Sequence, residues 1–167
     1  MKPIIIEIEI PEDTRRMIVA CRDKAGMGRA IARTMDRQNA LTAHRIRQKL
    51  TGEVLNVRTG TLRRSIGYTK AIVNGDEVQS TVGSGAGFGA ESVSYAAFWE
   101  YGYTGTELVR AHVRRRLTGG FSNVKSHARK VAQAPRSFVG STVADRAPEY
   151  GTSILQTAAD FAGGNHE

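Results

Sequence analysis

Few residues in this chain have the types and spacing that acid–base or metal chemistry requires. Glu100 is the one carboxylate set among aromatic residues, between Trp99 and Tyr101, where it could act as a general acid. No partner groups accompany it, so a helix-surface glutamate paired with an arginine is the favoured interpretation. His112 and His127 could approach each other across a hairpin, but no Cys, Asp or Glu stands beside them to complete a metal set. We therefore expect no catalytic residue, no cofactor and no metal, and an enzyme is the least favoured class.

The chemistry that the sequence does favour is contact between a cationic surface and a partner. Residues 109–115 and 124–130 are similar segments that alternate small or apolar residues with basic ones, which is the period-two pattern of a strand with two different faces. Turn formers fill residues 118–123 between them. From Leu108 to Arg136 there are eight Lys or Arg and no Asp or Glu. These features predict a long basic β-hairpin.

We expect this hairpin to pair Leu117 with Val124, because that register sorts the side chains by charge. One side would then carry Val109, Ala111, Val113, Leu117, Val124, Ser126 and Ala128. The other side, the candidate contact surface for a partner or for DNA, would carry Arg110, His112, Arg114, Arg116, Lys125, His127 and Arg129. Such a ribbon is suited to touching something anionic or to lying on a neighbouring subunit.

Other segments indicate the elements that must carry this hairpin. Residues 4–10 alternate like a strand, and a helical pattern runs from about residue 12 to residue 50, with Gly26 and Gly28 expected to break or kink it. Its apolar stripe comprises Met27, Ile31, Met35, Gln38, Thr42, Ile46 and Leu50, and Ala30 and Leu41 broaden it. Its opposite side comprises Arg29, Arg33, Arg37, Arg47 and Lys49, and His44 is expected at the surface. An amphipathic helix laid on a sheet fits this pattern.

The second half of the body shows a hairpin and two further helices. Residues 66–73 and 77–82 predict two strands around Asn74-Gly75-Asp76, and a three-residue loop is preferred because it would pair Ile72 with Val78 and Tyr68 with Val82. Residues 83–89 lack a phosphate-binding pattern and predict a mobile loop. A short helix carrying Tyr95, Phe98 and Trp99 should end at Gly102, and a final helix should carry Tyr150, Ile154, Ala158 and Phe161.

Length and composition indicate a single domain over residues 1–167, with residues 108–133 as a protruding β-hairpin insertion. The chain is 40% hydrophobic and 24% charged, as is usual for a globular protein, and carries a formal net charge of +8. We expect no membrane span and no signal peptide. The basic balance favours contact with nucleic acid or with an acidic protein surface, without choosing between them.

Three short segments, in this order, resemble motifs of a family of small proteins from long-tailed bacteriophages. They are Thr59-Gly60-Thr61-Leu62-Arg63-Arg64-Ser65-Ile66, Tyr95-Ala96-Ala97-Phe98-Trp99-Glu100-Tyr101-Gly102 and Ala134-Pro135-Arg136-Ser137-Phe138-Val139. The family is the gene-product-ten-like tail-component group, which includes tail-completion and tail-terminator proteins of the head–tail junction. The chain differs from its usual pattern at residues 135–137, where the family commonly has Arg-Pro.

The resemblance implies an α+β subunit: an antiparallel curved sheet packed by a long N-terminal helix and a C-terminal helix, with a projecting basic β-hairpin. It implies a structural virion protein, without enzymatic activity, that is assembled in the host cytoplasm and forms a ring, commonly a hexamer. Its partners would be copies of itself, the tail tube protein and the head-completion or connector proteins, with non-specific contact to DNA passing through the lumen. The alternative is a cytoplasmic nucleic-acid-binding protein that places the basic ribbon in a groove.

Overall fold

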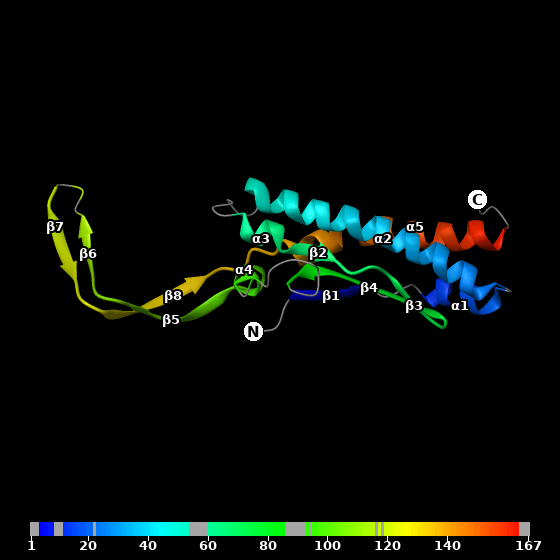
Figure 1. The fold of residues 1–167 in the computed structure, drawn as a ribbon, viewed down its shortest axis with the longest axis horizontal. Coiled ribbons are helices and arrows are strands. Elements are labelled where there is room, and N and C mark those ends of the chain that lie inside the picture. The colour runs from blue at the N-terminus through cyan, green and yellow to red at the C-terminus, as the bar shows by residue number, and fades with distance from the viewer. Residues whose placement is uncertain are drawn as a thin grey trace.

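The computed structural model describes residues 4–8, 12–21, 23–53, 60–85, 93, 95–115, 117 and 119–163. Its fold is α+β: a body of antiparallel strands and two long helices, and a two-stranded arm that projects from one end of the body (Figure 1). The expected fold class is confirmed. Among the described residues, no helix combines the length and the apolar character that a membrane span requires.

The sheet of the body is built around β4 (Glu77–Ser84), with which all of its remaining described strands pair. β1 (Ile4–Ile8) and β2 (Ile66–Tyr68) flank it, and β3 (Ile72–Asn74) pairs with its first residues, all antiparallel. Of β4, Val78 and Val82 are buried while Glu77 and Gln79 are exposed. This alternation is that of a strand with one covered face.

The register of the hairpin changes by one residue between its two ends. Near the sheet centre Tyr68 pairs with Val82, as expected, but Ile72 pairs with Gln79 and not with Val78. Two residues of one strand therefore oppose Ser80 of the other, which is a β-bulge. Because of the bulge, the hairpin can combine a two-residue turn at Gly75-Asp76 with an apolar face that continues to Val82. It also leaves the Ala71 N–H free of the ladder, and that N–H donates to Asp36 Oδ1 at 2.8 Å.

The long N-terminal helical pattern forms two helices, α1 (Glu12–Ala20) and α2 (Lys24–Gln48), followed by the segment η1 (Lys49–Glu53), in which the backbone kinks away from helical geometry at Thr51 and Gly52. The helical pattern is interrupted between Ala20 and Lys24, and α2 runs through both Gly26 and Gly28, so the prediction that these glycines break the helix was wrong. The helix α2 begins after Asp23, whose carboxylate accepts a hydrogen bond from Gly26 N at 2.8 Å and caps the helix. Gly28 instead allows α2 to approach the sheet, since an added Cβ would lie 2.8 Å from Val73 Cγ1.

The seven residues of the apolar stripe predicted along this helix are all buried, which confirms the stripe, but Leu41, expected to broaden it, is 47% exposed. The stripe packs on the sheet and on α5 (Val139–Ala162), which runs beside α2 (Figure 1). The predicted stripe of α5 is confirmed as well: Tyr150, Ile154 and Ala158 are buried, and Phe161 packs against them. On the opposite side of α2, Arg29, Arg33, Arg37 and His44 are exposed as expected, whereas Arg47 donates to Ile66 O at 2.6 Å.

Lys49 was expected on the basic surface, and this prediction was wrong. Its side chain is buried and its Nζ donates to Asp145 Oδ2 at 2.8 Å and to Ser141 Oγ at 3.0 Å, which ties the end of α2 to the start of α5. The hydrogen bond from Lys49, with the charge of its ammonium group, lowers the pKa of the Asp145 carboxyl below its ordinary value.

A buried polar chain crosses the interior between the two long helices and the sheet. The Tyr150 hydroxyl donates to Asn39 Oδ1 at 3.0 Å, and Asn39 Nδ2 donates to Ser80 Oγ at 2.6 Å. Burial raises the pKa of Tyr150 to about 12, although hydrogen bonds with Ser80 and Asn39 act in the opposite direction. These bonds fix the distance between α5, α2 and β4.

The short aromatic helix is confirmed as α4 (Ala96–Tyr101), which ends at Gly102 with φ of 80°. One other short helix, α3 (Thr61–Arg64), precedes β2. Of the loop expected at residues 83–89, Gly83 and Ser84 belong to β4, and residues 86–89 lie outside the described part of the chain.

Candidate functional site

The arm is a continuous antiparallel ribbon made in two halves. β5 (Tyr103–Val109) pairs with β8 (His127–Gln133), and further out β6 (His112–Arg115) pairs with β7 (Phe121–Val124). The ribbon bends where the halves meet, at residues 110–111 and 125–126 (Figure 1). The prediction of a projecting hairpin in this part of the chain is confirmed; its paired strands begin at Tyr103, five residues earlier than expected.

The expected register of this hairpin was wrong. Val124 pairs with His112 and not with Leu117, and the last pair before the turn is Arg115 with Phe121. The turn therefore lies between Arg115 and Phe121, where Gly119 and Gly120 have φ of 89° and 79° and can adopt the left-handed conformation that other residues avoid. Each residue is therefore opposed by one that lies five positions from its expected partner, and this odd-numbered shift changes which side chains share a face.

As a consequence, the basic residues are divided between both faces of the ribbon. Directly opposed residues share a face, so His112 and Arg114 lie with Val124 and Ser122. The other face of the outer half carries Val113, Arg115, Phe121 and Asn123, and Lys125 lies beyond its end. No single cationic face exists in the described part of the arm.

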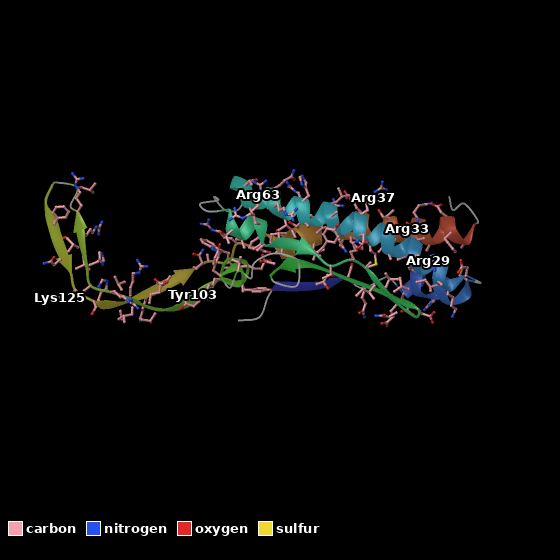
Figure 2. All side chains as sticks on the ribbon, viewed as in Figure 1. Arg29, Arg33, Arg37, Arg63, Tyr103 and Lys125 are labelled. Atoms are coloured by element: carbon pink, nitrogen blue, oxygen red, sulfur yellow. The ribbon has the colours of Figure 1, made fainter. Side chains whose placement is uncertain are left out.

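Six of the seven predicted contact residues lie in the described part of the arm. Arg110 lies between β5 and β6, His112 and Arg114 lie in β6, Lys125 lies between β7 and β8, and His127 and Arg129 lie in β8; all six are exposed. Arg116 lies outside the described residues. Figure 2 shows Lys125 far from the body.

Two local contacts repeat within the arm, as the repeated sequence would lead one to expect. His112 Nδ1 lies 3.0 Å from Arg110 O, and His127 Nδ1 lies 3.0 Å from Lys125 O. The two histidines pair with Val124 and Val109, so they do not oppose each other. Throughout the described residues, no group of three or more His, Cys, Asp or Glu could hold a metal ion.

One cation of the arm is already paired, because Arg129 Nη2 donates to Glu107 Oε2 at 3.0 Å. Both side chains are largely exposed, so this ion pair contributes little to stability. The Glu107 carboxylate also partly offsets the positive charge of the inner half of the arm. The sequence prediction did not use Glu107 because the register that would bring it beside Arg129 was not recognised.

The arm also exposes large apolar side chains that the sequence prediction did not single out as a contact surface. Leu108, Val113 and Phe121 are 74%, 64% and 73% exposed, and Leu117 at the turn is fully exposed. Val113 and Phe121 share one face of the outer half. Large apolar residues gathered on a projecting ribbon are typical of a surface that is covered by a partner.

The base of the arm is held by Glu100, for which the predicted surface position was wrong. The side chain is buried, and its Oε2 accepts from Phe138 N at 2.8 Å and Val139 N at 3.0 Å. Its Oε1 accepts from Gly140 N at 2.8 Å and Ser137 Oγ at 2.6 Å. Glu100 is therefore the N-terminal cap of α5, supplied from α4, and its negative charge lies at the positive end of that helix.

Further contacts join α4 to the strands of the arm. Arg136 N donates to Trp99 O at 2.7 Å, and the Arg136 guanidinium lies 5.8 Å from the centre of the Trp99 ring. The Phe98 ring packs on Tyr103, the first residue of β5, with centroids 4.6 Å apart (Figure 2 labels Tyr103). The arm thus leaves the body from a rigid anchor made by α4 and residues 134–140.

The geometry shows an α+β body with an anchored, projecting ribbon whose side chains are largely exposed. Residues 22–102 match the model of the family described as "Bacteriophage HK97-gp10, putative tail-component". The resemblance to the gene-product-ten-like tail-component family is thereby confirmed. No curated protein and no solved structure matches the chain.

The match indicates a structural, non-enzymatic component of a phage tail, and hence a virion-associated protein. It begins just before α2 and ends at Gly102, at the residue before β5. The arm and α5 therefore lie outside the matched range. The matched part contains Glu100, whose partners in α5 lie beyond the match.

Proposed function

We propose that this protein is a ring-forming subunit of the phage head–tail junction, acting as a tail terminator, a tail-completion protein or a neck ring, and that its arm lies across the next copy in the ring. Six copies is the number that the family resemblance favours. The ring would join the tail tube protein to the head-completion or connector proteins.

The observation that supports this proposal is the exposure of apolar side chains on an arm that projects from its own body. Val113 and Phe121 contact nothing that would cover them in the described part of the chain, and burying two such side chains in a partner stabilises an interface by about 1.5–3 kcal/mol each. An extended ribbon also presents backbone edges that can add to a neighbour's sheet. Since every copy carries the same arm, head-to-tail contact of this kind closes into a ring when the rotation between copies permits.

The alternative function, a nucleic-acid-binding protein that inserts a basic ribbon into a groove, has lost its main argument. It required the basic residues to share one face, and the register divides them between two.

The experiment compares the mass of the assembled protein with and without the apolar residues of the arm, by sedimentation of the full chain. Val113→Ser combined with Phe121→Ser should shift rings to monomers, because the contact would lose its buried apolar area. Ile72→Ser is the matched control, since Ile72 is an equally exposed strand residue on the body and should leave the rings intact. Rings that persist in the arm variant, or a wild-type protein that is monomeric at all concentrations, would refute the proposal.

A further inference from the structure

Three arginines form a row along the exposed side of α2. Arg29, Arg33 and Arg37 are exposed and follow one another at intervals of four residues, which places them about 6 Å apart along the helix axis. Figure 2 shows them in succession on the body, far from Lys125 in the arm. Like charges at this spacing oppose one another and destabilise a helix, so the row needs a reason other than stability.

The row has no compensating carboxylates. No hydrogen bond or ion pair joins any of the three guanidinium groups to another residue of the described ranges. Asp36 is the one acidic residue within α2, and its Oδ1 accepts from Ala71 N on the sheet side. Surface helices normally mix charges of both signs, whereas this one presents positive charge alone.

A hollow adjoins the start of the row, between the first turns of α2 and the last turn of α5. Arg29, Arg33 and Thr34 line it, together with Phe161. Asp23 also lines it, but its carboxylate is engaged by Gly26 N. The Thr34 hydroxyl is engaged by Thr157 Oγ1 at 2.8 Å, so the two guanidinium groups are the donors that this open hollow offers to the oxygens of an anionic group.

The chemistry of the row favours a phosphate backbone over a protein partner. Protein interfaces have an apolar or aromatic centre, and Leu41 is the one large exposed apolar residue among the described residues of α2. Duplex DNA carries one negative charge per about 1.7 Å of its axis, and arginines bind its phosphates without an apolar centre, with affinity supplied by counterion release. A ridge of positive charge with little apolar area fits this second mode.

We infer that the outer face of α2 is a sequence-independent binding surface for the backbone of duplex DNA, with Arg29, Arg33 and Arg37 as the phosphate contacts. This inference assigns DNA contact to the body of the subunit and leaves the arm to assembly. It does not require the ring, because one copy of α2 carries the whole row.

The test measures binding of the full chain to a fluorescein-labelled duplex of mixed sequence by anisotropy, between about 50 and 200 mM salt. Arg29→Gln, Arg33→Gln and Arg37→Gln, combined, should weaken binding at least tenfold at the lowest salt. They should also reduce the slope of log affinity against log salt by about 2.7, since each phosphate contact contributes about 0.9. The matched control removes three cations from the arm by Arg110→Gln, Arg114→Gln and Lys125→Gln, and should change the slope by less than about 1.

Several results would overturn the inference. They are wild-type protein that does not bind the duplex at the lowest salt, an α2 variant that binds like the wild type, and an arm variant that loses as much affinity as the α2 variant. Displacement of DNA by polyglutamate as effectively as by unlabelled duplex would also overturn it, because the partner would then be an acidic protein segment. The sedimentation measurement of rings is independent of all these outcomes, so the two proposals can fail separately.

Discussion

Glu100 joins the part of the chain that matches the phage family to the part that does not. Its two carboxylate oxygens accept from three backbone N–H groups and one hydroxyl at the start of α5. The residue at the helix boundary, Phe138, has no side chain able to cap the helix. A carboxylate from a distant helix therefore does the work of a local capping residue, and it fixes where the arm returns to the body.

Replacing Glu100 tests this role at the level of one side chain. Glu100→Gln should lower the free energy of unfolding by about 2–4 kcal/mol, because the amide loses the charge and places donors against backbone N–H groups that are buried. Urea unfolding provides the measurement. Glu107→Gln is the control, since Glu107 is an exposed arm residue in one ion pair and its loss should cost less than about 1 kcal/mol. An equal loss of unfolding free energy in the two variants would contradict the capping role of Glu100.

The sequence indicated that Glu100 was unusual but could not indicate why. Its aromatic neighbours marked a packed helix correctly, and the preferred interpretation as a surface ion pair failed because the partners of Glu100 are backbone groups from residue 138 onward. Backbone N–H donors cannot be recognised from the amino-acid sequence, because every residue except proline carries one. The order of the two family motifs around residues 95–102 and 134–139 was the available signal, and their spatial contact becomes visible only in the fold.

At the scale of elements, the packing of α2 against α5 and the sheet depends on small and polar residues as well as on apolar ones. Gly28 permits close approach to Val73. Lys49 and Asp145 join the ends of the two helices. The apolar stripes of both helices could be predicted because helical periodicity is a local property.

A pair of glycine substitutions tests the close approach. Gly28→Ala should fail to stabilise the protein, or should destabilise it by about 1–3 kcal/mol, because the new methyl group would force Val73 to move. Gly151→Ala, in α5, should raise stability by about 0.5–1 kcal/mol, since an added Cβ there meets no atom within 4 Å and alanine favours the helix. Thermal unfolding distinguishes the two, and a stabilising Gly28→Ala would contradict the packing.

The ion pair between Lys49 and Asp145 should make the stability of the protein depend on pH in the acidic range. Because Lys49 lowers the Asp145 pKa below 3.8, the ion pair contributes stability above that value and loses it as the pH falls through the lowered pKa. A carboxyl NMR titration should show the Asp145 pKa returning toward 3.8 in Lys49→Met, a variant that keeps the buried aliphatic stem. An unchanged Asp145 pKa in that variant would show that Lys49 is not the cause.

The strand elements were predicted less well than the helices, for a reason that the two hairpins share. Both were assigned a register that keeps one face uniform, and both registers differ in the structure. In the body a bulge at residues 70–71 restores the apolar face after a two-residue turn. In the arm no core constrains the register, so the turn at Gly119 and Gly120 decides it.

At the scale of the whole molecule, the chain separates two kinds of surface. The arm carries exposed apolar residues and scattered cations, and the body carries a row of arginines on α2 (Figure 2). The net charge of +8 follows from composition, but its division between surfaces could not be predicted, since that division depends on strand register and on which carboxylates are engaged. We expect assembly contacts from the first surface and polyanion contacts from the second.

The most direct test of the central claim asks what the end of the arm touches in the assembled protein. A photoreactive phenylalanine analogue at position 121, in purified full-length protein at concentrations where it assembles, should form cross-links that join two copies and double the mass of the chain. Digestion and mass spectrometry should place the second attachment point on the body of the neighbouring copy. Cross-links confined to single chains would contradict the account, because the arm would then lie against its own subunit.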